Sequence, residues 1–165
     1  MRLDDEALDS LAMSLAAEMK AQGRRLATAE SCTGGWIAKI CTDLPGSSAW
    51  FDRGFVSYSN EAKRDMLGVS AATIHRFGAV SEMVAAAMAE GAVKHSLADC
   101  SVAVSGIAGP SGGSPDKPVG TVCFGWCWAN GQLETEQHHF AGDRDAVRRA
   151  TVATALDGLF RRLRG

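Results

Sequence analysis

Short apolar runs alternate with segments of helical periodicity along most of the chain, and this alternation constrains the fold more than any other feature. The spacing of apolar and turn residues predicts strands at residues 26–29, 51–58, 101–104, 119–128 and 133–140. Helices are expected between them, at residues 4–20, 60–67 and 82–97 and in segments that follow Thr33, Ser70 and Asp143. This order predicts an α/β fold with helical layers around a mixed sheet.

Polar residues stand at the start of several of these helical segments, where side chains commonly cap the first turn. Helix starts or caps are expected at Thr33, Asn60, Ser70, Ser81 and Asp143. Asn130 and Gly131 separate the last two predicted strands, and this dipeptide is a strong signal for a tight turn. We therefore expect one β-hairpin late in the sheet.

Composition limits the classes of protein to which the chain can belong. With 165 residues, 46% hydrophobic and 22% charged, it has the size of one globular domain covering residues 1–165. A net charge of −2 offers no basic surface for nucleic acid. No apolar run is long enough to span a bilayer, and the acidic N-terminus lacks a signal-peptide core. Five cysteines, an odd number, fit reduced thiols, so we expect a cytoplasmic protein. From the charge and the apolar runs we expect no nucleic-acid or membrane partner.

Two glycine-rich stretches, residues 28–35 and 105–113, each follow a predicted strand. Exposed backbone N–H groups at such a junction can hold an anion, and a hydroxyl there is easily approached. Between the two stretches, residues 58–63 offer a phenol and an amine. Together these segments predict a phosphate-bearing substrate and a serine nucleophile.

Ser31 is the candidate nucleophile in the first stretch. A serine between a strand and a helix can simply cap the helix, but here Thr33 is available as the cap. Gly34 and Gly35 would let the backbone approach a ligand closely, and the Glu30 carboxylate could orient a cation. A free serine is a weak nucleophile and needs a neighbouring base.

Lys63 is the best candidate for that base. The sequence has no Gly-x-Ser-x-Gly turn, and the pattern favours surface or packing positions for His75, His95, His138 and His139. Burial or a helix N-terminus would lower the lysine pKa enough for it to accept a proton. Tyr58 could relay a proton or donate to an oxyanion. The alternatives are that Lys63 is an exposed helix residue and that Tyr58 is an aromatic residue at a strand end without a role in chemistry.

The second stretch predicts a loop shaped around a nucleotide. It starts with Ser105 at the end of a strand and carries four glycines: Gly106, Gly109, Gly112 and Gly113. It is not a phosphate-binding P-loop, because the Gly-Lys-Ser/Thr ending is missing, and a flexible surface loop is the alternative. Arg144 and Arg148 lie four residues apart on one helix face, where they could clamp a phosphate or form surface ion pairs.

The cysteines offer two weaker alternatives. Cys123 and Cys127 could bind zinc with His138 and His139, but their spacing is unlike the usual tetrahedral sites and favours a buried strand face. Cys32 could act as a nucleophile, but the sequence gives it no evident base.

Several blocks of the sequence match a known family. They are TAESCTGG at residues 28–35, GFVSYSNEAK at 54–63, GAVSE at 78–82, SGIAGPSGG at 105–113, KPVGT at 117–121 and GDR at 142–144. In these blocks the chain resembles the CinA C-terminal domain family, which includes nicotinamide-nucleotide amidohydrolases. Many members carry a larger second domain, and this chain looks like the stand-alone form.

The resemblance implies a single three-layer α/β/α domain that deamidates nicotinamide mononucleotide in pyridine-nucleotide salvage and NAD metabolism. Ser31 would be the nucleophile, Lys63 its base and Tyr58 a supporting proton donor. Backbone N–H groups beside Gly34 and Gly35 would be oxyanion donors, and Ser105 with the loop from Gly106 would line the nucleotide site. No metal or redox cofactor is needed, and a homo-oligomer is allowed. The alternative function is a non-catalytic nucleotide-binding regulatory module of the competence- or damage-inducible type.

Overall fold

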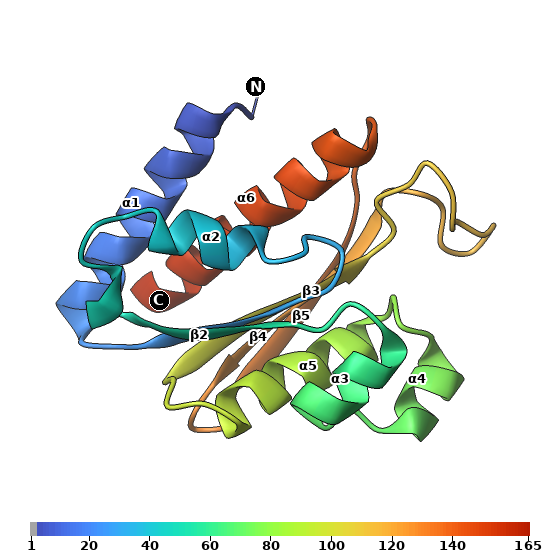
Figure 1. Cartoon of the computed structure of the whole chain (residues 1–165), viewed down its shortest axis with the longest axis horizontal. Coiled ribbons are helices and arrows are strands. Elements are labelled where there is room, and N and C mark those ends of the chain that lie inside the picture. Colours follow the sequence, from blue (N-terminus) through green and yellow to red (C-terminus); the bar gives the residue numbers. More distant parts are fainter. Residues whose placement is uncertain (1–2) are drawn as a thin grey trace.

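The computed structural model describes residues 3–165, which form a five-stranded sheet between two layers of helices (Figure 1). This arrangement confirms the predicted α/β fold with a mixed sheet and a late hairpin. The elements follow in the order α1 (Asp5–Gln22), β1 (Leu26–Glu30), α2 (Trp36–Thr42), the 3-10 helix η1 (Ser47–Ala49), β2 (Phe51–Val56), α3 (Asn60–Leu67), α4 (Ala71–Phe77), α5 (Glu82–Lys94), β3 (Cys100–Gly106), β4 (Thr121–Trp128), β5 (Leu133–His139) and α6 (Arg144–Arg164).

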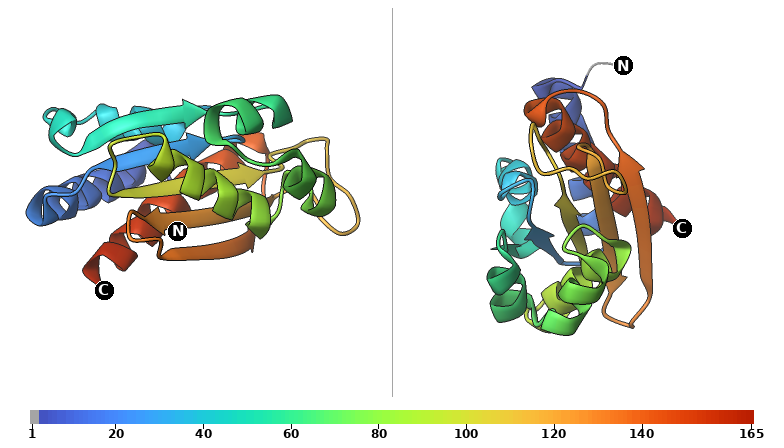
Figure 2. Two further views of the ribbon diagram at one scale, coloured as in Figure 1. Left: turned by 90° about the horizontal axis from the view of Figure 1, so that it is seen from below. Right: turned by 90° about the vertical axis from the view of Figure 1, so that its right-hand side faces the viewer.

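The strand order explains why distant loops meet. Neighbouring strands follow the order β2-β1-β3-β4-β5, which the view from below in Figure 2 shows across the sheet. Strands β2, β1 and β3 are parallel, whereas β4 and β5 each run antiparallel to the strand before them. Glu30 at the end of β1 pairs with Val56 of β2 and Val104 of β3. The segments that follow these three strands therefore emerge at the same edge, where α/β proteins commonly bind ligands.

The core lies on both faces of the three central strands, whose residues are almost all buried. Helices α1, α2 and α6 cover one face, where Leu15, Trp126 and Leu156 are fully buried. Helices α3, α4 and α5 lie over the other face, where Met88 is fully buried. Each such side chain contributes roughly 1.5–3 kcal/mol on burial, so the helices fix the sheet on both sides.

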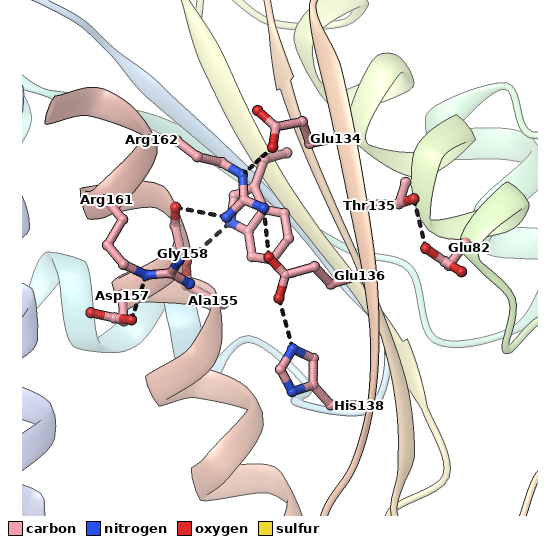
Figure 3. Close-up of polar contacts among 11 residues, drawn as sticks. Glu82, Glu134, Thr135, Glu136, His138, Ala155, Asp157, Gly158, Arg161 and Arg162 are labelled. Carbon is pink, nitrogen blue, oxygen red and sulfur yellow. Dashed lines mark hydrogen bonds and ion pairs between the residues drawn. The ribbon is translucent and has the colours of Figure 1, made fainter. Parts of the chain in front are cut away.

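Arg162 of α6 ties the last helix to the edge strand β5 (Figure 3). Its guanidinium donates to the Glu136 carboxylate at 2.6 Å and to the Gly158 carbonyl at 3.0 Å, and it lies 3.4 Å from the Glu134 carboxylate. It also stacks over the Trp126 ring at 3.8 Å. These contacts hold α6 in a defined position against the sheet, and the start of α6 borders the site described below.

Most expected helix caps are confirmed. Ser70, Ser81 and Asp143 each accept a hydrogen bond from a first-turn N–H group. Two predictions were wrong: α3 is capped by Ser59 rather than Asn60, and Thr33 does not cap α2, which begins after Gly35. Both errors place the cap within two residues of the observed position, Ser59 for α3 and Gly35 for α2, and a local sequence pattern defines a helix end to no better than this.

The remaining differences are at element ends. β2 ends at Val56, two residues before the predicted end, and α5 ends at Lys94 rather than near residue 97. The predicted hairpin turn is present, with Gly131 in the left-handed backbone region at φ 92°. Between residues 3 and 165, the helices are all too short or too polar to cross a bilayer.

Candidate active site

Ser31 directly follows β1 and is held by its backbone. Its N–H donates to the Val104 carbonyl at 3.1 Å, and its own carbonyl accepts from the Gly34 N–H at 3.1 Å. The side chain is largely buried, and its hydroxyl lies 3.3 Å from the Tyr58 carbonyl and 3.0 Å from the Lys63 amine. The sheet edge thus fixes the direction in which the hydroxyl points.

Lys63 reaches Ser31 from helix α3, the first helix after β2. Its side chain is 1% exposed, although α3 lies at the surface of the fold. Its amino nitrogen lies 3.0 Å from the Ser31 hydroxyl, 3.2 Å from the Ser57 carbonyl and 3.0 Å from the Tyr58 carbonyl. Within the described part of the chain, none of the ion pairs involves Lys63. Burial without a counter-ion lowers the pKa of Lys63.

The three contacts of the lysine nitrogen define how a neutral amine would sit. A neutral amine has two N–H groups and one lone pair. The carbonyls of Ser57 and Tyr58 can only accept hydrogen bonds, so they take the two N–H groups. A neutral Lys63 would therefore direct its lone pair to the Ser31 hydroxyl, whose oxygen also lies 3.3 Å from the Tyr58 carbonyl.

Glu30 and Thr33 bond each other and the start of α2, whereas the sequence suggested that Glu30 orients a cation and that Thr33 caps the helix. The Glu30 carboxylate, 1% exposed, accepts from the Thr33 hydroxyl at 2.5 Å and from the N–H groups of Ile37 and Ala38 at 2.8 and 3.0 Å. An anion at a helix N-terminus is favourable, and this one caps α2 from the strand before it. Glu30 therefore braces the turn that carries Ser31, and the sequence analysis missed this role because the carboxylate bonds residues seven and eight positions ahead.

Gly34 and Gly35 make the sharp turn into α2. Both lie in the left-handed region, at φ 60° and 102°, which residues with a side chain rarely adopt. The Gly34 N–H is already bonded to the Ser31 carbonyl, so it is not free for an oxyanion. Among residues 3–165, no carbonyl accepts from the N–H of Cys32 or Thr33. The Gly35 N–H also has no carbonyl acceptor in this range, so the unpaired donors near Ser31 are those of Cys32, Thr33 and Gly35, which lie at or beside the glycines named from the sequence.

A cavity of about 210 Å³ opens beside the Ser31 hydroxyl. Its walls come from the segments after β1 and β2, from the end of β3 and the loop after it, from α3, from the connection between α4 and α5, and from the start of α6. The lining residues are Ser31, Cys32, Tyr58, Asn60, Lys63, Ala79, Ser105, Gly106, Ala108 and Arg144. The Ser105 hydroxyl donates to the Ala79 carbonyl at 2.8 Å. Asn60 and Ala79 were not expected here, since no residue type marks them as site residues, whereas Ala108 lies in the loop that was expected to line the site.

Tyr58 and Arg144 stand at the mouth of this cavity. Tyr58 is 61% exposed, and its phenol oxygen lies 3.5 Å from the Arg144 guanidinium. Arg144 also donates to the Gly109 carbonyl at 2.7 Å. The contact between Tyr58 and Lys63 runs through the tyrosine carbonyl and not through the phenol. The phenol is therefore directed to the entrance rather than to the nucleophile.

The second glycine-rich loop connects β3 to β4 and extends beyond the sheet (Figure 1). Ser105 and Gly106 at its start line the cavity, and Gly109 contacts Arg144. Gly112 and Gly113 are exposed and are not among the lining residues of this cavity. The structure thus brings the start of the loop to Ser31 but not its outer part.

Arg148 lies one turn after Arg144 but has other partners. Its guanidinium donates to the carbonyls of Cys32 and Thr33, both at 3.1 Å. It borders a larger cleft of about 670 Å³ between α1, α2 and α6, which Ser31 and Lys63 do not line. The Ser31 hydroxyl and the Lys63 amine therefore meet in the smaller cavity, which Arg144 lines, whereas Arg148 lines the larger cleft.

The cysteines do not form the alternative sites considered from the sequence. Cys32 is buried, and burial raises the pKa of its thiol to about 12, so it is protonated near neutral pH. In the sheet register Cys123 pairs with Gln137 and His138 with Val122, so Cys123 and His138 face opposite sides. Across residues 3–165, no group of three or more histidine, cysteine or acidic side chains is arranged to hold a metal ion.

Comparison with known proteins gives a consistent result. The family model of the CinA C-terminal domain matches residues 8–163. A protein of Escherichia coli strain K12 named nicotinamide-nucleotide amidohydrolase PncC is 54% identical over 158 residues, 96% of each chain. A Pseudomonas putida protein of the same name is 50% identical over 152 residues, 92% of this chain and 94% of that one. The crystal structure of a competence/damage inducible protein, CihA, from Agrobacterium tumefaciens matches with a TM-score of 0.92 and 46% identity over 96% of each chain.

Proposed function

The chain belongs to the CinA C-terminal domain family, and from this premise we propose that it is a nicotinamide-nucleotide amidohydrolase. It would hydrolyse the carboxamide of nicotinamide mononucleotide to give nicotinate mononucleotide and ammonia. The observation that carries the proposal is the buried lysine amine 3.0 Å from the hydroxyl of a serine that lines a cavity. A binding site alone has no need for a buried, unpaired lysine beside a serine.

In the first step, the Lys63 lone pair accepts the Ser31 proton as the serine oxygen attacks the carboxamide carbon. The N–H groups of Cys32 and Thr33, which have no carbonyl acceptor in the part of the chain that the structure describes, would donate to the oxyanion that develops. The protonated lysine then returns the proton to the amide nitrogen, the carbon–nitrogen bond breaks and ammonia leaves. An acyl ester on Ser31 remains, so one difficult hydrolysis becomes two easier steps.

In the second step, a water molecule attacks the ester carbonyl. Lys63 accepts a proton from the water and delivers it to the Ser31 oxygen as the ester bond breaks. The acid product gives its remaining proton to solvent and leaves as a carboxylate, and both side chains regain their starting protonation states. The two carbonyls that hold Lys63 keep its nitrogen in place for both transfers.

The size of the cavity suggests how a nucleotide would lie. At about 210 Å³ it is smaller than the roughly 300–1,000 Å³ of pockets that enclose a whole ligand. The pyridine ring would enter it, with Ser105 and Gly106 beside the ring. The ribose phosphate would then extend to the mouth, where Tyr58 and Arg144 can contact it, and along the loop that carries Gly109, Gly112 and Gly113.

The proposal is tested by measuring ammonia release from nicotinamide mononucleotide with the wild-type protein and Lys63→Met. Lys94→Ala is the matched control, because Lys94 is an exposed lysine at the end of α5. We expect turnover by the wild type and the control, and a loss of at least about 100-fold in Lys63→Met, as for loss of a general base. Tight nucleotide binding without turnover in the wild type would instead indicate a regulatory binding module.

A further inference from the structure

Two arginines of helix α6, Arg144 and Arg148, lie near the site and have different hydrogen-bond partners. Arg144 reaches the mouth of the Ser31 cavity, whereas Arg148 reaches the backbone of the turn that carries Ser31. The Arg148 Nε donates to the Cys32 carbonyl and one Nη donates to the Thr33 carbonyl, each at 3.1 Å. A planar guanidinium fixes both carbonyls at once, which a lysine amine cannot do in the same geometry.

The direction of these two carbonyls sets the direction of two N–H groups. In a trans peptide the C=O and the N–H of the next residue point in opposite directions, and the peptides after Cys32 and Thr33 are trans. The carbonyls that face Arg148 therefore turn the N–H groups of Thr33 and Gly34 away from α6. The Gly34 N–H meets the Ser31 carbonyl, so this direction is toward the backbone of the residue that carries the nucleophile.

The guanidinium of Arg148 is itself held in place. It lies 5.6 Å from the centre of the half-buried Trp36 ring, which packs against the apolar core between the sheet and helices α1, α2 and α6. Arg149, the next residue, lies 5.1 Å from the same ring but pairs with Asp5 and Asp145 instead of the turn. Of these two adjacent arginines, only Arg148 bonds the carbonyls of the Ser31 turn.

We propose that Arg148 is a positioning residue that holds the turn after Ser31 so that the Thr33 N–H faces the oxyanion. This inference rests on the proposed amidohydrolase activity, and it replaces the phosphate contact expected for Arg148 from the sequence. The Cys32 carbonyl accepts only from Arg148 among residues 3–165, so loss of the guanidinium frees the first peptide of the turn. The arginine acts on the rate through this peptide and not through contact with substrate.

The test compares Arg148→Gln and Arg148→Lys with Arg149→Gln, which removes a neighbouring arginine that stacks on the same ring. Steady-state rates with nicotinamide mononucleotide give kcat and KM, and calorimetry gives the Kd of nicotinate mononucleotide. Loss of one oxyanion donor typically lowers kcat about 100- to 1,000-fold, and we expect a kcat loss of about 100-fold in both Arg148 variants. KM and the product Kd should change less than about threefold, and Arg149→Gln should retain the wild-type kcat.

A product Kd weakened tenfold or more with kcat unchanged would overturn the proposal and assign Arg148 to the phosphate. Hydrogen exchange of the amides at residues 32–35 gives a readout that is independent of activity. Exchange there should be faster in Arg148→Gln and unchanged in Arg149→Gln; equal exchange in all three proteins would contradict the positioning role. If the wild type released no ammonia, the proposed activity would fail, whereas this exchange comparison would still decide whether Arg148 holds the turn.

Discussion

The amino nitrogen of Lys63 lies 3.0 Å from the hydroxyl oxygen of Ser31, although 32 positions separate the two residues in the chain. Parallel pairing of β1 with β2 brings them together, because the segments after both strands emerge at one edge of the sheet. The lysine is buried and has carbonyl partners, so it can hold its lone pair toward the hydroxyl. This contact is the basis of the proposed chemistry.

The pH dependence of the reaction should follow Lys63. Burial lowers the pKa of Lys63, and only the neutral amine can accept the Ser31 proton. We expect kcat/KM to rise with pH and to level off above an apparent pKa that lies below the ordinary lysine value of about 10.4. A rate profile from about pH 6 to about pH 10 measures this, and a rate that falls across the range would contradict the role of the lysine as a base.

The same shift predicts a change in stability. Because the unfolded chain binds the lysine proton more tightly than the folded one, the free energy of unfolding should decrease as the pH falls from the ordinary lysine pKa to the lowered one. Lys63→Met should remove this dependence. Urea unfolding of both proteins across the alkaline range checks the result, and parallel curves for the two would show that the amine is not the group responsible.

Glu30 should contribute to both stability and rate. Glu30→Ala leaves the N–H groups of Ile37 and Ala38 without their acceptor, which costs about 1–3 kcal/mol for each buried group left unpaired. Glu6→Gln is the control, because Glu6 is an exposed acid in the first turn of α1. Urea unfolding should show a loss of at least about 1 kcal/mol in Glu30→Ala and less than about 0.5 kcal/mol in the control. A Glu30→Ala protein as stable and active as the wild type would refute the bracing role.

Gly35→Ala tests the turn into α2. At φ 102° a side chain is strained, and a Cβ would lie 3.3 Å from the Val56 side chain. Gly131→Ala shares the left-handed strain at φ 92° but meets no atom within 4 Å, and it lies in the distant hairpin. Both should lose about 1–2 kcal/mol of stability by thermal unfolding, whereas only Gly35→Ala should lower kcat. An equal loss of kcat in both would mean that the effect is not local to the turn.

The fold was predictable where local signals agree. The strand that ends before Ser31, the Asn130-Gly131 hairpin and the cap at Asp143 all follow from apolar runs and turn residues in short windows. The cap predicted at Asn60 was wrong because the adjacent Ser59 takes that role, and the one at Thr33 was wrong because α2 begins after Gly35 and the Glu30 carboxylate bonds its first N–H groups. The ends of β2 and α5 were misplaced because nothing in a short stretch of sequence fixes the last residue of an element.

The site was less accessible from the sequence, because its geometry depends on strand register. Ser31 and Lys63 were singled out by residue type, but their contact depends on pairing between β1 and β2, which no local pattern specifies. The role of Glu30 could not be read, since its partners lie on a helix whose start was misplaced. For Arg148, periodicity gave the helix face correctly but could not tell a backbone carbonyl from a phosphate as its partner.

The edge strand offers a prediction away from the site. Burial tends to raise the pKa of Glu136, but hydrogen bonds from Arg162 and His138 outweigh it and hold the pKa below its ordinary value. Arg162→Met should cost about 1–3 kcal/mol near neutral pH, a range suited to a partly buried charged bond. The difference should shrink as the pH falls through the lowered Glu136 pKa, because the carboxylate is then lost in both proteins. Arg161→Gln, which breaks an exposed pair with Asp157, should cost less than about 1 kcal/mol in the same urea titrations.

The most direct test of the central claim is the rate of ammonia release from nicotinamide mononucleotide by Ser31→Ala, at saturating substrate and compared with the wild type. With the nucleophile removed and the cavity otherwise intact, the account predicts a fall in kcat of at least about 1,000-fold while the product still binds. A Ser31→Ala protein that retains kcat within about tenfold of the wild type would contradict the assignment of Ser31 as the nucleophile.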